Sequence, residues 1–213
     1  MKIQLALDDI SLTEALALVD NIYEYIDIIE IGTPFIIKEG VKCIKSFRER
    51  FPDKEILADL KIMDAGYYEA ESAFKIGANY ITVLGVTDLI TIKECKEVAK
   101  KYDANVVVDM ICVSDLPKKI KELEELDVDY IAVHVGVDQQ ALGRRPIDDL
   151  KVMKQYVTKT KIAVAGGINA ETIDEYLKLS PDIIIIGSGI VHASDPIEAI
   201  QKIRKSILSF ANK

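Results

Sequence analysis

The chain has 213 residues, of which 49% are hydrophobic, and its formal net charge is −8. This length is typical of one α/β barrel, so we expect a single domain over residues 1–213. The negative charge argues against nucleic-acid binding and against a membrane-surface role, because both need a basic face. The three cysteines lack disulfide or zinc-ligand spacing, and no signal peptide or membrane span is apparent, so we expect a cytoplasmic protein.

Short apolar runs alternate with stretches of helical spacing along the whole chain. The first run, residues 3–8, is followed by a helix-capping pattern at Ser11 and Glu14. The run Ile183–Ile186 is apolar on both faces, which is typical of a parallel sheet covered on both sides. We expect strands at residues 3–8, 25–31, 55–60, 79–84, 104–111, 129–135, 161–165 and 182–186.

Eight strand–helix units in one chain predict the fold class. They favour a single (β/α)8 TIM barrel, in which parallel strands close on themselves and helices cover the outside. A flavodoxin-like doubly wound sheet is the second candidate, but it uses about five such units and would leave the others unexplained. The last predicted helix carries one apolar stripe, as expected for a helix on a sheet, at Ile197, Ile200, Ile203 and Ile207.

The third predicted strand ends in a charged segment, Ala58-Asp59-Leu60-Lys61-Ile62-Met63-Asp64. Because side chains alternate along a strand, Asp59 and Lys61 project to the same side, whereas Asp64 lies in the loop to the next helix. Two carboxylates around one ammonium at the end of an apolar strand indicate a functional site. The alternative is a structural ion pair that closes the strand end, which a lone Asp-x-Lys pattern would favour.

Other predicted strands also end in ionisable residues or in glycine, which favours a site. Active sites of barrels lie at the carboxyl ends of the strands, so these residues converge on one mouth. Strand alternation aims Asp8 and His134 inward, although an aspartate there could instead cap a helix and a histidine could belong to the core. Glu30 lies between two isoleucines, and a carboxylate at that depth needs a metal or another cation as its partner. In chain order the strand ends carry Asp8, Glu30, Asp59 with Lys61, Gly85, Asp109 and His134.

The last two predicted strands end in glycine turns, Gly166-Gly167 and Gly187-Ser188-Gly189. In barrels this position often holds a phosphate, because glycine lets an anion approach backbone N–H groups. Simple tight turns are the alternative interpretation. The turns therefore predict that one side of the mouth binds a phosphate group.

Two parts of the sequence resemble a known family. The pattern Asp59-x-Lys61-x-x-Asp64 resembles the signature of the orotidine 5′-phosphate decarboxylase superfamily. The segments 58–66 and 133–141 look like those of the 3-hexulose-6-phosphate synthase family, and the resemblance extends over residues 5–196. It implies an aldolase (a carbon–carbon lyase) that uses Mg²⁺ and condenses D-ribulose 5-phosphate with formaldehyde to D-arabino-hex-3-ulose 6-phosphate. This reaction belongs to the ribulose monophosphate pathway of formaldehyde fixation.

The nearest alternative is the 3-keto-L-gulonate-6-phosphate decarboxylase family, which shares the metal and lysine residues. That family carries glutamate where this chain has Asp109, arginine at the positions of Val137 and Ser188, and threonine at that of Ala165. These differences favour the synthase family. A third interpretation, from another class, is a non-catalytic barrel that binds a phosphometabolite and whose carboxylates hold a structural cation.

The residues favour a metal-stabilised enediolate over a Schiff base at Lys61. The nearby carboxylates of Asp59 and Asp64 should raise the pKa of Lys61 and keep it an ammonium, whereas a Schiff base needs a neutral amine. Glu30 and Asp59 are hard oxygen ligands suited to Mg²⁺, with Mn²⁺ as an alternative metal. His134 is expected to move the C1 proton of the substrate, because the intrinsic pKa of imidazole lies near neutrality.

The remaining residues bind or orient the substrate in this scheme. Asp109 shares proton transfer or orients a water, and Asp8 hydrogen-bonds the substrate hydroxyls. By resemblance, Asp64 acts in the partner subunit's site across a homodimer interface. The substrate phosphate is expected on the backbone amides of Gly166, Gly167, Gly187 and Ser188.

Overall fold

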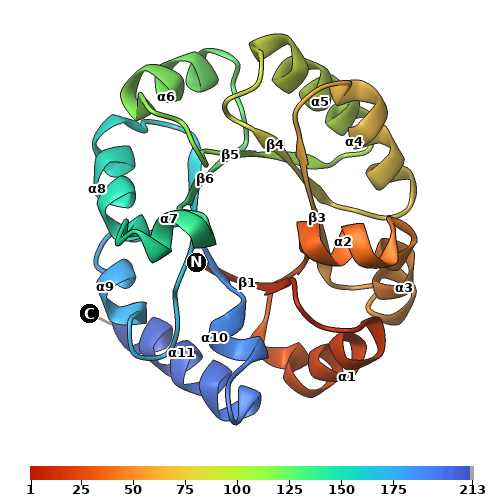
Figure 1. Ribbon diagram of the computed structural model, residues 1–213, viewed down its shortest axis with the longest axis vertical. Helices are drawn as coiled ribbons and strands as arrows, with labels where there is room; N and C mark the ends of the chain where they lie inside the picture. The colour runs from red at the N-terminus through yellow and green to blue at the C-terminus, as the bar shows by residue number, and fades with distance from the viewer. Residues whose placement is uncertain (212–213) are drawn as a thin grey trace.

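Parallel strands close into an eight-stranded barrel in the computed structural model, which describes residues 1–211 (Figure 1). Neighbouring strands pair in chain order, and β8 closes the barrel by pairing with β1. This topology confirms the predicted (β/α)8 barrel and excludes a doubly wound open sheet. Residues 212 and 213, where the predicted domain ends, lie outside the described part. The strands are β1 (Lys2–Leu7), β2 (Ile28–Ile31), β3 (Glu55–Ile62), β4 (Tyr80–Leu84), β5 (Asn105–Asp109), β6 (Tyr130–His134), β7 (Lys161–Ala165) and β8 (Ile183–Ile186).

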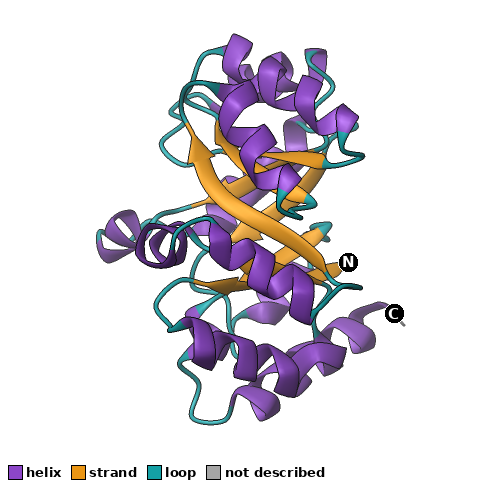
Figure 2. Cartoon of the chain, turned by 90° about the vertical axis from the view of Figure 1, so that its right-hand side faces the viewer, coloured by secondary structure: helices purple, strands orange, loops and turns teal. Residues whose placement is uncertain are grey.

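Helices connect successive strands and surround the barrel, so that the strands run through the middle of the molecule (Figures 1 and 2). None of the helices within residues 1–211 is both long and apolar enough to cross a bilayer. The helical elements are α1 (Leu12–Ile22), η1 (Tyr23–Tyr25), α2 (Thr33–Glu39), α3 (Lys42–Arg50), α4 (Gly66–Lys75), α5 (Leu89–Lys101), α6 (Leu116–Glu125), α7 (Val137–Ala141), α8 (Pro146–Tyr156), α9 (Ile173–Leu177), α10 (Ser188–Val191) and α11 (Pro196–Ala211).

Alternation along the strands divides their side chains between two packed layers. Outward-facing residues such as Ile29, Ile81 and Ile184 are fully buried against the helices. Because both faces of the sheet are covered, strands with apolar residues at every position are stable here. Inward-facing residues form a second cluster inside the barrel, made of Ala6, Ile28, Leu57, Tyr80, Val107, Tyr130, Ala132, Ala163, Ile183 and Ile185. The next inward positions towards the carboxyl ends of the strands therefore line the mouth.

The predicted elements are present, and the clearest local differences lie in the second strand and in the last helix. The capping box at Ser11 and Glu14 is confirmed at the start of α1. The second strand begins at Ile28 instead of residue 25, because Tyr23–Tyr25 forms a 3-10 turn after α1. In α11, Ile197 belongs to the first turn and is 41% exposed, whereas the other isoleucines of the predicted stripe are buried, at Ile200, Ile203 and Ile207.

Candidate active site

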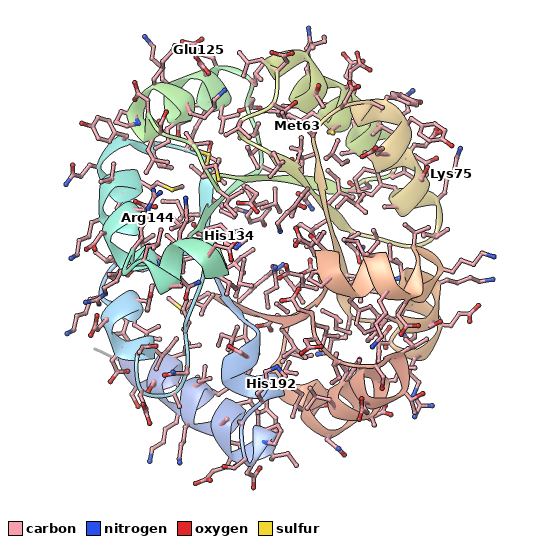
Figure 3. The ribbon with its side chains drawn as sticks, in the orientation of Figure 1. Met63, Lys75, Glu125, His134, Arg144 and His192 are labelled. Carbon is pink, nitrogen blue, oxygen red and sulfur yellow. The ribbon has the colours of Figure 1, made fainter. Side chains whose placement is uncertain are left out.

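The carboxyl ends of the strands surround a cavity of about 680 Å³. In Figure 3, His134 lies on the inner side of the ring of strands, whereas Lys75 and Glu125 lie on its outer side. A second cavity, of about 640 Å³, lies among α1, η1 and the end of α3 and holds none of the predicted site residues. The predicted residues that line the mouth cavity are Asp8, Glu30, Asp59, Lys61, Asp109, His134, Gly166, Gly167, Gly187 and Ser188.

A bulge in β3 sets the direction of Lys61. The register between β3 and β4 shifts between Ala58 and Ile62, and Lys61 itself has a left-handed φ of 47°. The backbone N–H of Lys61 donates to the hydroxyl of Thr82 on β4 at 2.8 Å, which ties the bulged residue to the neighbouring strand. Because a bulge re-aims a side chain at a strand end, the ammonium of Lys61 reaches the carboxylates inside the mouth.

Asp59 is buried, and protein donors hold its carboxylate in place. The hydroxyl of Thr82 lies 2.7 Å from Oδ1, and the hydroxyl of Thr33 lies 2.8 Å from Oδ2. The ammonium of Lys61 also contacts Oδ2. These donors offset the desolvation of the carboxylate and fix its orientation, while Oδ1 keeps a lone pair for a further ligand.

Lys61 lies between two carboxylates, because its Nζ is also 3.5 Å from Oδ2 of Asp109. Burial by itself would lower the pKa of Lys61, but the charges of Asp59 and Asp109 and the hydrogen bond to Asp59 raise it to about 12. Lys61 is therefore an ammonium at neutral pH, as the sequence predicted. The prediction that Asp64 is the second carboxylate beside Lys61 was wrong. Asp64 is exposed in the loop after β3, where it accepts the N–H of Ala65 at 2.7 Å.

Asp109 joins Lys61 to His134. Its Oδ2 lies 2.8 Å from Nδ1 of His134, and its Oδ1 accepts the N–H of Ile111 at 2.9 Å. Burial would raise the pKa of Asp109, but His134, Lys61 and the Ile111 amide together hold it below the ordinary value. Because an ionised Asp109 can only accept, Nδ1 of His134 donates to it, and Nε2 of a neutral imidazole is left as a proton acceptor.

Glu30 is a buried carboxylate on β2, and the Nε2 group of Gln4 donates to its Oε2 at 2.7 Å. Among the described residues, no lysine, arginine or histidine lies within 4.0 Å of it. Burial, and then the charge of Asp59, raise the pKa of Glu30 to about 8. Glu30 thus has the depth that the sequence predicted, and no cationic side chain among residues 1–211 forms an ion pair with it.

The donor set of the mouth fits Mg²⁺. Glu30 and Asp59 offer two hard carboxylate groups, and Glu30 is costly to ionise without a cation. Within residues 1–211 no group of three or more histidine, cysteine or acidic side chains is arranged to hold a metal. A zinc-type cage is therefore not formed by these residues, whereas Mg²⁺ is usually bound by one or two carboxylates plus substrate and water oxygens.

Glycines line the cavity after β7 and allow close packing behind Asp8. Gly166 has φ of +113°, and a Cβ atom there would lie 2.7 Å from the Pro146 side chain. Gly167 follows with φ of +65°, so both residues of this turn after β7 need glycine. Gly32 lies beside Asp8, and a Cβ atom at that position would lie 1.9 Å from the Asp8 carboxylate and 2.6 Å from a backbone oxygen.

Sequence reasoning missed Gln4, Thr33 and Thr82, which hold the two proposed ligand carboxylates. Thr82 and Gln4 carried a detectable signal, because each is a polar residue at an inward position of an otherwise apolar strand. Thr33 carried none, because it lies outside the strands, at the start of α2.

Comparison with known proteins now identifies the family. The model of the orotidine 5′-phosphate decarboxylase / HUMPS family matches residues 1–203. The chain belongs to this family. It is 46% identical over 207 residues to a 3-hexulose-6-phosphate synthase of Staphylococcus haemolyticus, an alignment that covers 97% of this chain and 99% of the relative. It follows that the chain is an enzyme of this family.

Solved structures agree with this placement. The crystal structure of 3-hexulose-6-phosphate synthase from Salmonella typhimurium matches with a TM-score of 0.96 and 52% identity, over 99% of this chain and 100% of the other. A 3-keto-L-gulonate-6-phosphate decarboxylase from Vibrio cholerae matches with a TM-score of 0.84 and 26% identity, over 98% of both chains. The similarity to the synthases is thus clearly higher than the similarity to this decarboxylase.

Proposed function

We propose that the chain is an aldehyde-lyase that condenses D-ribulose 5-phosphate with formaldehyde to D-arabino-hex-3-ulose 6-phosphate. The observation that carries this proposal is the chain of contacts from Asp59 through Lys61 and Asp109 to His134 inside a cavity walled by glycine turns. An ammonium, an ionised carboxylate and an imidazole in line are suited to removing a proton next to a carbonyl. The relatives named 3-hexulose-6-phosphate synthase support the same reaction.

Glu30 and Asp59 would hold the divalent cation, with Mg²⁺ as the expected metal and Mn²⁺ as the alternative. When bound there, the cation would polarise the C2 carbonyl of the substrate and offset the negative charge that forms on its oxygen. Thr33 and Thr82 keep Asp59 oriented, and Gln4 contacts Glu30. The protein residues thus supply two ligand groups whose orientation is fixed before the substrate arrives.

His134 is the proposed base. Its Nε2 takes a proton from C1 of ribulose 5-phosphate, and the electron pair of the broken C–H bond forms the enediolate. The C2 carbonyl then re-forms as the enediolate electron pair bonds C1 to the formaldehyde carbon. The formaldehyde oxygen takes the electron pair of its own double bond, and His134 returns the proton to that oxygen. Asp109 holds the imidazole in the tautomer that this step needs, because it accepts from Nδ1 at 2.8 Å. Its low pKa makes Asp109 a positioning residue instead of a proton donor.

Lys61 stabilises the developing oxyanion as an ammonium. Its raised pKa argues against a Schiff base, which requires a neutral amine. Asp8 lines the same cavity and is assigned to the substrate hydroxyls. The amides of the two glycine turns bind the substrate phosphate in this proposal, because the turns form one side of the cavity at Gly166, Gly167, Gly187 and Ser188.

Asp64 is assigned to the partner subunit's site of a homodimer. It does not belong to the lining of its own cavity, and exposed apolar side chains lie near it in sequence and on the helices α4 and α5. Met63 is 54% exposed, Tyr68 74% and Ile90 59%, and apolar surface of this kind is typical of an interface. A second copy of the chain would cover these side chains and bring Asp64 to a substrate.

The test is formaldehyde consumption with ribulose 5-phosphate, first with Mg²⁺ and then with excess chelator. The proposal predicts rapid consumption that the chelator stops. Release of carbon dioxide from 3-keto-L-gulonate 6-phosphate, without formaldehyde consumption, would instead identify the decarboxylase and would mean that Asp109, Val137, Ala165 and Ser188 had been misinterpreted. Binding of sugar phosphate without either reaction would indicate the non-catalytic barrel.

A further inference from the structure

A buried amide lies directly beside the proposed metal ligand Glu30. Gln4 belongs to β1, faces the inside of the barrel and is 1% exposed. Its Nε2 donates to Oε2 of Glu30 at 2.7 Å. Its Oε1 is buried and has no hydrogen-bond partner among the described residues.

The surroundings of Gln4 give no packing reason for an amide. Its register partners on the neighbouring strands are Ile28 and Ile185, and the next inward residue on β1 is Ala6. An apolar side chain of the same length would fill this space without leaving an acceptor unpaired, and an unpaired buried acceptor costs free energy. The amide is therefore explained by its one contact, the carboxylate of Glu30.

That contact has a consequence for metal binding. Because Nε2 of Gln4 engages Oε2, the carboxylate of Glu30 is oriented with its other oxygen available to a cation. Partners of this kind orient metal ligands in many proteins, and their removal typically weakens metal binding by about 10- to 100-fold.

We propose that Gln4 is a positioning residue of the metal site, which holds the carboxylate of Glu30 ready for a divalent cation. This inference rests on the proposed function, because it takes Glu30 as a ligand. It assigns to Gln4 an effect on metal affinity and none on the chemical step. At saturating metal the turnover of a Gln4 variant should therefore be close to that of the wild type.

The experiment measures Mn²⁺ binding by electron paramagnetic resonance in the absence of substrate. Gln4→Met keeps the length of the side chain and removes the donor, and we expect it to weaken Mn²⁺ binding by about 10- to 100-fold. In activity assays the Mg²⁺ concentration for half-activation should rise by the same factor, with kcat at saturating Mg²⁺ nearly unchanged. Gln4→Asn, whose amide is too short to reach Glu30, should behave in the same way and replaces Gln4→Met if that variant does not fold.

Two further variants distinguish failure of the role of Gln4 from failure of the metal site. Tyr80→Phe removes part-buried hydrogen bonds of its hydroxyl to Glu55 and Lys2 without touching Glu30, and its Mn²⁺ affinity should equal that of the wild type. An equal loss in Tyr80→Phe would overturn the role of Gln4, because it would indicate general loosening of the barrel. If the Gln4 variants bind Mn²⁺ normally and Glu30→Gln does not bind it, the role of Gln4 is overturned and the metal site is retained. Normal binding in Glu30→Gln would overturn the metal site itself.

Discussion

Asp109 contacts both of the groups that the proposed reaction needs. Its carboxylate lies 2.8 Å from Nδ1 of His134 and 3.5 Å from Nζ of Lys61. Burial alone would favour a neutral carboxyl group, but the hydrogen bond to His134, the charge of Lys61 and a backbone amide keep it ionised. One buried carboxylate therefore fixes the tautomer of the base and balances part of the charge of the ammonium.

At the residue scale, Glu30 should link stability to metal binding. Without metal, Glu30→Gln should be at least as stable as the wild type, because it replaces a buried acid that is costly to ionise with a neutral side chain of the same size. Mg²⁺ at about 100 times its Kd should stabilise the wild type by about 2.7 kcal/mol and leave Glu30→Gln unchanged. Thermal unfolding of both proteins, with chelator and with Mg²⁺, measures this. An equal shift in both would place the metal elsewhere.

The sequence allowed Asp8 and His134 to be predicted as inward-facing, because strand alternation is a local property. It did not allow their partners to be predicted, because those come from other strands. The second carboxylate beside Lys61 is Asp109 on β5, which is distant in sequence, whereas the predicted neighbour Asp64 is exposed. Which charged side chains meet inside a barrel depends on barrel closure and on the register between strands, and the sequence of a single strand determines neither.

At the scale of elements, the bulge in β3 illustrates the same limit. The strand itself was predicted from its apolar alternation, but the register shift between Ala58 and Ile62 depends on pairing with β4. The left-handed conformation of Lys61 and its bond to Thr82 exist only in that pairing. The predicted order of units and the glycine turns after β7 and β8 needed no such information, because each follows from a short segment.

Glu124 at the end of α6 should give the stability a defined pH dependence. Burial would raise its pKa, but the N–H groups of Thr158, Lys159 and Thr160 and the Thr158 hydroxyl lower it from 4.5 to about 2. This stabilisation is complete above pH 4.5 and is lost as the pH falls towards 2. Glu124→Gln should therefore lower the free energy of unfolding by about 1 kcal/mol at pH 7, after allowance for solvent screening, and by less at pH 3. Urea unfolding at the two pH values measures it, and an equal difference at both would contradict the role of the charge.

At the scale of the whole molecule, the position of Asp64 predicts shared active sites. Asp64 is exposed and outside the cavity lining of its own chain, so Asp64→Ala and Lys61→Met should each be inactive alone. Mixing the two variants under conditions of subunit exchange should restore about one quarter of wild-type activity, because half of the dimers are mixed and each contains one intact site. Assays before and after mixing test this, with sedimentation to establish the dimer. A fully active monomer, or no recovery in a proven mixed dimer, would contradict the shared site.

The proton transfer assigned to His134 is tested most directly by exchange of the C1 hydrogens of ribulose 5-phosphate in D₂O, followed by proton NMR without formaldehyde. We expect the wild type with Mg²⁺ to exchange one C1 hydrogen, because His134 removes that proton before the carbon–carbon bond forms. Chelator and His134→Gln should each stop the exchange, with the second losing about 100-fold or more. Absence of exchange in the wild type, or undiminished exchange in His134→Gln, would contradict the proposed role of this cluster.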